Sequence, residues 1–236
     1  MSETSRLNLP LLMPAQAQKH VTVNEALSRL DAAVNLVLVT LDLTTPPEAV
    51  AEGLAYGVPS GAVNDWAGHE GQIAVGQNGG WIFLTPRAGW RAQIADRGVG
   101  AIHDGLGWQV GALSLSPHGA GLLCGVAEHL HELMPGTENS TAWALPGPAM
   151  IVGVTARVVT SITGTLTGWS LGMPGAPARF GQGLGKDGGS WCRGLLGAPT
   201  TFWSPEPLVL TAEGGAFSGG SVRIAVHYLE LALPRD

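Results

Sequence analysis

Residues 221–233 read SVRIAVHYLELAL, and this stretch decides the fold class. Two sets of side chains alternate along it: Val222, Ile224, Val226 and Tyr228 in one set, Arg223, Ala225, His227 and Leu229 in the other. Successive side chains of a β-strand point to opposite faces, so each set shares a face. The stretch therefore predicts a strand with one face on an apolar core.

The preceding residues repeat this pattern back to about residue 147. Residues 149–160, AMIVGVTARVVT, are β-branched and largely alternating, and residues 166–171 and 207–211 are further short apolar runs. Glycine turns separate the runs, which is typical of a β-sandwich or jelly roll. We expect residues 147–236 to form a C-terminal domain of this class, and the whole chain to be mainly β.

Residues 46–112 contain a weak internal repeat. GQIAVGQNGGWIF at 71–83 aligns with GVGAIHDGLGWQV at 98–110, with Trp81 and Trp108 in register. Each copy reads as two strands joined by a glycine turn, which predicts hairpins in a small Trp-rich antiparallel β-module. Residues 113–146 are expected to be a linker, in which residues 122–133 form either a strand or a short helix.

Residues 1–45 are predicted to be an apolar strap followed by a helix. Five apolar side chains of the strap are expected to anchor the chain to a partner: Leu7, Leu9, Leu11, Leu12 and Met13. Pro10 and Pro14 exclude a continuous helix there. Thr22 and Glu25 have capping-box spacing, and an apolar stripe follows, which predicts a helix over residues 23–37. The stripe consists of Leu27, Leu30, Val34 and Val37.

The composition restricts the classes of protein further. Charged residues make up 13% of the 236, against about a quarter in typical chains, and the mean hydropathy is +0.21. No apolar run reaches the roughly 18 residues of a membrane span, so the apolar surplus is assigned to subunit interfaces. A net charge of −6 argues against nucleic-acid binding. No signal peptide is apparent, and Cys124 and Cys192 are expected to be free buried thiols.

Several motifs resemble phage-type tail or head fibre proteins with a DUF2793 domain, including the head spikes of gene transfer agents. In the N-terminal half the resemblance is carried by LNLP at 7–10, PAQAQKH at 14–20, NEAL at 24–27, WAG at 66–68, GQIA at 71–74 and TPRAGW at 85–90. In the C-terminal half it is carried by ITG at 162–164, RFG at 179–181, PTTF at 199–202, LVLTA at 208–212, and GG at 219–220 followed by VRIAVHYL at 222–229.

The resemblance implies a homo-oligomeric spike or fibre subunit of a phage-like particle. Its N-terminal part is expected to dock on a capsid or tail protein, and its C-terminal part to contact a host cell-surface polysaccharide. Such a protein is made in the bacterial cytoplasm and released by lysis. Closed symmetry is expected, either a trimer or a pentamer.

Tryptophans are the candidate sugar contacts, because an indole offers a large apolar face and a polar N–H. In the C-terminal domain these are Trp169, Trp191 and Trp203. Core packing or a subunit contact is the alternative for each. Glycine, serine and proline neighbours favour exposure of Trp191 and Trp203, whereas the repeat register favours core positions for Trp81 and Trp108.

No residue pattern predicts catalysis, a metal or a cofactor. His129 and His131 would share a strand face, but no third ligand accompanies them, so a solvated polar stretch is favoured over a metal site. The sequence favours a binding protein that is not an enzyme. Two alternatives stay open: a capsule-degrading tail enzyme, and a structural collar or decoration protein that touches no receptor.

Overall fold

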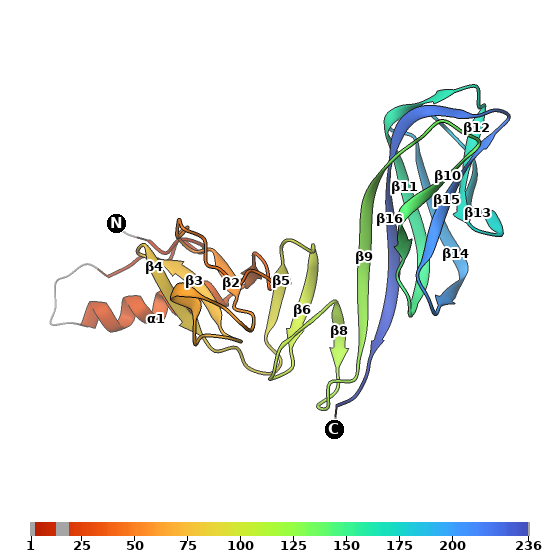
Figure 1. The fold of residues 1–236 in the computed structure, drawn as a ribbon. Helices are drawn as coiled ribbons and strands as arrows, with labels where there is room; N and C mark the ends of the chain where they lie inside the picture. The colour runs from red at the N-terminus through yellow and green to blue at the C-terminus, as the bar shows by residue number, and fades with distance from the viewer. Residues whose placement is uncertain (1–2, 13–18, 236) are drawn as a thin grey trace. The chain divides into compact units, whose positions relative to one another are not determined.

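The computed structural model describes residues 3–12 and 19–235. The chain divides into two compact units, which are described separately (Figure 1). Unit 1 comprises Met1–Gly121 with Pro234–Asp236, and unit 2 comprises Leu122–Leu233. The described residues contain one α-helix, one 3₁₀-helix and sixteen strands, so the chain is mainly β as predicted.

Helix α1 spans Lys19–Ala33, about one turn closer to the N-terminus than predicted. Thr22 therefore lies inside the helix and does not cap it. The helix ends before Asn35, which adopts a left-handed conformation with φ 49° that an asparagine tolerates well.

Most of the apolar stripe predicted for the helix is exposed. Leu30 and Val34 are 51% and 37% exposed, whereas Ala32 and the following Leu36 are buried. The helix faces the core through Ala32 because Asp31, beside it, is held by the strap, as described below. Much of the apolar stripe is thus left on the surface of unit 1.

The sheet of unit 1 is mixed, which corrects the prediction of an antiparallel module. Its seven strands lie in the order β4-β3-β2-β1-β5-β6-β7, and β1 is parallel to both β2 and β5 while the other pairs are antiparallel. The strands are β1 Val37–Leu38, β2 Ala55–Gly57, β3 Ile73–Gln77, β4 Gly80–Leu84, β5 Arg91–Ile94, β6 Val99–His103 and β7 Trp108–Val110. The strand after the helix enters the middle of the sheet, a placement that local patterning does not encode.

Both copies of the sequence repeat form hairpins, as predicted: β3 pairs with β4, and β6 pairs with β7. The β3–β4 turn is Asn78-Gly79, with φ of 52° and 75°, the conformation that makes Asn-Gly a preferred hairpin turn. In the second turn the Asp104 carboxylate accepts hydrogen bonds from the backbone N–H groups of Leu106 and Gly107.

An aromatic cluster fixes one side of this sheet. Trp66, in the 3₁₀-helix η1 (Asn64–Trp66), is fully buried between Tyr56 and Trp81, with ring centroids 5.4 and 5.2 Å away. A second cluster includes Leu38 and Ile73 on the central strands. Trp108 packs partly buried against that second cluster.

Residues 113–146, predicted to be a linker, hold strands instead. They are β8 Ala112–Leu115, β9 Gly121–Glu132 and β10 Glu138–Leu145. Residues 122–133, for which strand and helix were both open, are therefore mostly strand. Leu122 and Leu123 are half-buried, whereas Val126 and Leu130 are exposed, so the apolar side chains of this strand do not form one buried face.

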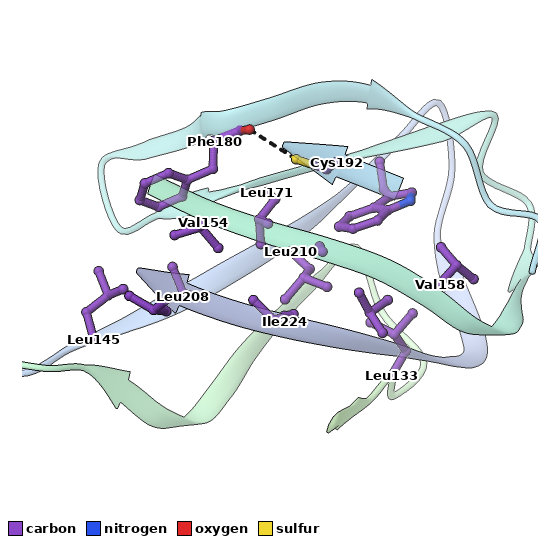
Figure 2. Packing of buried hydrophobic residues seen from close by; sticks show 14 of the residues in the cluster. Leu133, Leu145, Val154, Val158, Leu171, Phe180, Cys192, Leu208, Leu210 and Ile224 are labelled. Atoms are coloured by element: carbon purple, nitrogen blue, oxygen red, sulfur yellow. Dashed lines mark hydrogen bonds between the residues drawn. The ribbon is translucent and has the colours of Figure 1, made fainter. Parts of the chain in front are cut away.

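Unit 2 is a sandwich of two antiparallel sheets with one core between them. The strand orders within this unit are β10-β15-β12-β13 and β14-β11-β16-β9. The remaining strands are β11 Ala149–Gly164, β12 Gly168–Met173, β13 Ala176–Leu184, β14 Trp191–Phe202, β15 Glu206–Glu213 and β16 Phe217–Ala232. Figure 2 shows both sheets contributing to the core, with Leu171 and Leu210 from one and Val154 and Ile224 from the other.

The cysteines are free: Cys192 is buried and Cys124 is half-buried. Cys192 donates its S–H to the carbonyl oxygen of Phe180 in the core of unit 2 (Figure 2). Among the described residues, no helix has the length and apolar character needed to cross a membrane.

Candidate functional site

The outward face of the β14-β11-β16-β9 sheet carries the candidate site of unit 2. Side chains on β11 alternate, so Ala156 and Val158 are buried in the core while Arg157 is exposed. The same alternation on β14 buries Cys192 and exposes Trp191 and Arg193. The outward set is thus fixed by the apolar side chains that occupy the opposite face.

Strand register brings three of these side chains into one row. Arg157 of β11 pairs with Trp191 of β14 on one side and with Arg223 of β16 on the other. The next outward row places Arg193 opposite Thr155, which lies opposite Ala225. Neighbouring strands are about 4.8 Å apart, so each row spans roughly 10 Å.

The charged groups of the rows have weak partners within the chain. The guanidinium of Arg193 lies 5.8 Å from the ring centroid of Trp191, a cation–π distance. Arg223 approaches Glu128 at 3.8 Å, with both side chains more than half exposed. Among the described residues, none forms a hydrogen bond or an ion pair with the side chain of Arg157. Exposed ion pairs contribute about 0–1 kcal/mol, so these guanidinium groups retain donors for a ligand.

The two rows enclose a shallow open groove of about 520 Å³. Its lining consists of Glu128, Thr155, Ala156, Arg157, Trp191, Cys192, Arg193, Arg223 and Ala225. With three arginines and one glutamate it is locally positive. Unit 2 as a whole carries seven Asp and Glu residues but only five Lys and Arg residues. Three of these five basic residues line the groove, and the other two are Arg179 and Lys186. The basic side chains of an acidic unit are therefore concentrated at one place.

Adjacent to the groove, Thr155 and His227 form a hydrogen bond, with Oγ1 and Nε2 3.1 Å apart. Thr155 is half-buried and lines the groove. Hydroxyl and imidazole groups can both accept and donate, so they suit ligand hydroxyl groups. The site thus combines an aromatic surface, several cations and neutral polar groups.

The structure separates the three tryptophans predicted to contact sugar. Trp191 is 64% exposed and Trp203 is 83% exposed, as their neighbours indicated. Trp191 is the first residue of β14, however, and Trp203 directly follows its last residue, roughly 40 Å away along an extended strand, so they do not form one site.

Trp169 does not fit the predicted role. It is only 2% exposed, and its indole N–H donates to the carbonyl oxygen of Gly185 at 2.9 Å. Because both its ring and its polar group are used inside unit 2, it has no face for a sugar. Trp169 belongs to the buried apolar cluster of unit 2.

Sequence reasoning missed the three arginines of the groove. A signal was present, since Arg157 and Arg223 each interrupt a strand that is otherwise almost free of charge, and Trp191 and Arg193 are two residues apart. What the sequence lacks is the register that places these strands side by side.

The N-terminal strap is fastened to α1 by a buried carboxylate. Asp31, 4% exposed, accepts hydrogen bonds from the Thr4 hydroxyl at 2.7 Å and from the backbone N–H groups of Arg6 and Leu7 at 3.1 and 2.6 Å. The Arg6 guanidinium donates to the carbonyl oxygens of Ala32 and Asn35 at the end of the helix. The strap therefore belongs to unit 1 through polar contacts.

The predicted anchor residues remain largely outside the core of unit 1. Leu7 and Leu12 are 37% and 49% exposed, and Leu9 and Leu11 are half-buried. Met13 lies outside the described residues. The strap leucines and the exposed residues Val21, Val23, Leu30 and Val34 of the helix region leave unit 1 with apolar surface at its N-terminal end.

His129 and His131 both lie on β9, as a strand placement would require. In the described part of the chain, no three His, Cys, Asp or Glu side chains gather closely enough to hold a metal ion. Burial lowers the pKa of His131, against the opposing effect of Glu132, so its neutral form is favoured.

Comparisons with known proteins give one family match. Residues 23–109, a stretch within unit 1, match the DUF2793 family, which is described as a protein of unknown function. No curated protein matches the chain. A solved structure titled "Cyanophage Pam1 capsid asymmetric unit" matches with 22% identity over 50% of this chain and 91% of that chain, at a TM-score of 0.31.

Proposed function

We propose that this chain is a spike or fibre subunit of a phage-like particle, and that unit 2 binds a host cell-surface polysaccharide. Two findings support a virion protein: the match to the DUF2793 family and the resemblance of both halves of the sequence to fibre proteins with this domain. The observation that carries the binding function is the exposed Trp191 beside three arginines on a rigid sheet. The protein acts by binding and is not an enzyme.

In this proposal unit 1 attaches the chain to the particle, and we call this attachment the mount. Its strap is held in a defined conformation by Asp31, yet its leucines are left exposed beside the apolar residues of α1. Exposed apolar side chains that gather in one region are typical of a surface covered by another protein. The partner is a capsid or tail protein, or further copies of the chain in a trimer or pentamer.

Unit 2 faces the host in this proposal and binds its polysaccharide, and we call this role the display. A tryptophan ring stacks on the C–H face of a sugar, and polar neighbours bind its hydroxyl groups. Single sugar contacts of this kind are weak, and display in several copies converts them into useful avidity. A homo-oligomeric spike with several copies of the shallow groove would therefore bind the polysaccharide more tightly than a single copy.

The mount is tested by substituting the two exposed strap leucines, Leu7→Gln with Leu12→Gln, in cells that make the particle. Because the Asp31 contacts use the backbone and Thr4, the variant should fold normally but be absent from purified particles in mass spectrometry. The matched control is Leu106→Gln, since Leu106 is 80% exposed in a hairpin turn of unit 1 away from the strap. Normal incorporation of the strap variant, or absence of the wild-type chain from particles, contradicts the proposed mount.

The display is tested with purified full-length protein and host cells. Wild-type protein should bind cells that carry surface polysaccharide and not cells stripped of it, and Trp191→Ala should bind at least tenfold more weakly. Trp203→Ala is the control for loss of an exposed tryptophan outside the groove. Release of new reducing ends from the polysaccharide would show an enzyme instead, and particles lacking the chain that adsorb normally would show a structural collar protein.

A further inference from the structure

We infer that the groove around Trp191 selects anionic polysaccharide, with Arg157 and Arg223 binding the acidic group of a sugar whose ring stacks on Trp191. This inference rests on the proposed function and specifies its ligand class. The acidic group is a carboxylate or an ester phosphate, since both offer paired oxygens to a guanidinium. A neutral polysaccharide would leave these arginines without a role.

The first argument is the placement of like charges. Arg157 and Arg223 are directly opposite each other on neighbouring antiparallel strands and share the outward face. Directly opposed like charges destabilise a sheet. Glu128 offsets the repulsion only weakly, since it reaches Arg223 alone, at 3.8 Å and in solvent. A bound anion between the two guanidinium groups would remove the repulsion.

The second argument is the chemistry of the guanidinium group. Arginine presents a planar fork of donors that binds a carboxylate or phosphate through two parallel hydrogen bonds. Both arginines stand on strands whose other face is locked in the core through Ala156, Val158 and Ile224. The sheet therefore fixes the positions from which the side chains extend toward the ligand.

The third argument is the adjacent aromatic ring. Trp191 is the register neighbour of Arg157 on the side away from Arg223. The row therefore runs from ring to cation to cation over roughly 10 Å, which is wide enough for a pyranose ring and its acidic substituent. The guanidinium of Arg193 lies over the Trp191 ring, 5.8 Å from its centroid, and adds a third cation, while Thr155 lines the groove and is available to a sugar hydroxyl.

A nucleic acid would carry comparable acidic groups but fits the surroundings poorly. The chain has a net charge of −6, and Glu128 lies at the groove itself. Nucleic-acid binding depends on neutralising many closely spaced phosphates with a basic surface. Three arginines within an acidic unit suit a polymer with sparser charge, such as a polysaccharide with one acidic group per repeat.

The test uses full-length protein and polysaccharide from the surface of the host cells, separated into acidic and neutral fractions by anion exchange. Wild-type protein should bind the acidic fraction, measured by biolayer interferometry or calorimetry. Chemical reduction of its carboxyl groups, or in a parallel arm removal of its phosphates, should abolish binding and identify which group is recognised. Single-stranded DNA should bind at least tenfold more weakly than the acidic fraction.

The variants are Arg157→Gln and Arg223→Gln, each expected to weaken binding of the acidic fraction at least tenfold. The matched control is Arg179→Gln, which removes the same charge from β13, where Arg179 donates to the Thr200 hydroxyl outside the groove. Both groove variants should melt at or above the wild-type temperature, which shows that lost binding is not lost folding.

The outcomes separate this inference from the proposed function. Equal binding of neutral and acidic fractions, or equal losses in Arg157→Gln and Arg179→Gln, would overturn the inference and leave polysaccharide binding intact. Equal binding of single-stranded DNA would overturn it in favour of nonspecific attraction to polyanions. If neither fraction binds, both the inference and the proposed display fail, while incorporation into particles still tests the mount.

Discussion

Trp66 in unit 1 and Trp191 in unit 2 show how differently the two units use the same side chain. Trp66 is fully buried between two other aromatic rings, whereas Trp191 is 64% exposed on a sheet face with an arginine beside it. Buried aromatic rings contribute to stability through the area they remove from water. An exposed ring contributes little in that way, and so it is available for a ligand.

The charged groups of the two units repeat this contrast. Asp31 in unit 1 is buried and receives hydrogen bonds from three donors of the strap. Arg157 in unit 2 is exposed and opposed by a second arginine. Unit 1 thus satisfies its buried charge internally, while unit 2 keeps its cations on the surface at some cost in stability. On this difference rests the proposal that unit 1 is a scaffold and unit 2 a recognition surface.

The largest change in stability is expected for Trp66→Ala. Removing a fully buried tryptophan leaves a cavity in the aromatic cluster and should lower the stability of unit 1 by about 3–5 kcal/mol. Hydrogen exchange read peptide by peptide would report the loss in β3 and β4 separately from unit 2. In the matched variant Trp203→Ala, at an 83% exposed position, the change should stay within about 0.5 kcal/mol. Similar losses of stability in both variants would show that the two tryptophans do not differ in this way.

The second largest effect is expected for Asp31→Ala. It leaves the Thr4 hydroxyl and two backbone N–H groups without their acceptor, and hydrogen bonds to a charged group contribute about 1.5–3 kcal/mol each, not additively. We expect unit 1 to lose about 3 kcal/mol and the strap to exchange its amide hydrogens rapidly.

Glu25→Ala is the control for Asp31→Ala, because Glu25 is also a carboxylate of α1 but forms an exposed ion pair with Arg29. It should cost about 0.3–0.5 kcal/mol. If Asp31→Ala leaves strap exchange unchanged, the strap is held by something other than this carboxylate, and the account of the mount must be revised.

The strands of unit 2 were predictable because each carries its own alternating pattern, as in residues 221–233. The unit 1 hairpins were also predictable, since Asn78-Gly79 is a local turn signal. The mixed sheet was not, because the parallel pairing of β1 with β2 and β5 depends on contacts far along the chain.

The exposure of the helix stripe was not predictable for a related reason: apolar periodicity shows which side chains share a face, but not whether that face meets the chain's own core. Here Asp31 and the strap decide the question, and Leu30 is left half exposed. The candidate site was half predictable. The neighbours of Trp191 indicated exposure, whereas the row with Arg157 and Arg223 exists only through the register of three strands.

A smaller effect of opposite sign is expected for Arg157→Gln. Replacing one of two opposed arginines removes like-charge repulsion, which in a sheet is a matter of about 0.2–1 kcal/mol. The free protein should therefore become slightly more stable, as measured by thermal melting at low salt, and the gain should shrink at high salt. Arg179→Gln should show no such gain. A loss of stability in Arg157→Gln would mean that the groove cation has a structural role.

The smallest effect at neutral pH concerns the buried histidine of unit 1. His103 is 4% exposed, and its Nδ1 accepts a hydrogen bond from the Gly105 N–H at 3.1 Å. Burial lowers its pKa below the ordinary 6.5, against the opposing charge of Asp104. The unfolded chain therefore binds more protons than the folded chain in mildly acidic solution. The contribution of His103 to the stability of the folded chain is therefore fully present above about pH 6.5. It is lost as the pH falls from there toward the pKa of His103 in the folded chain.

His103→Gln should flatten the pH dependence of unit 1 stability between pH 5 and 7 and leave that of unit 2 unchanged. His131→Gln is the reciprocal control, because burial also lowers the pKa of His131, and it should act on unit 2 alone. Hydrogen exchange at matched pH values, corrected for intrinsic exchange rates, separates the two units. If either substitution alters both units equally, they do not unfold independently, and the contrast between scaffold and recognition surface would have to be drawn within one cooperative structure.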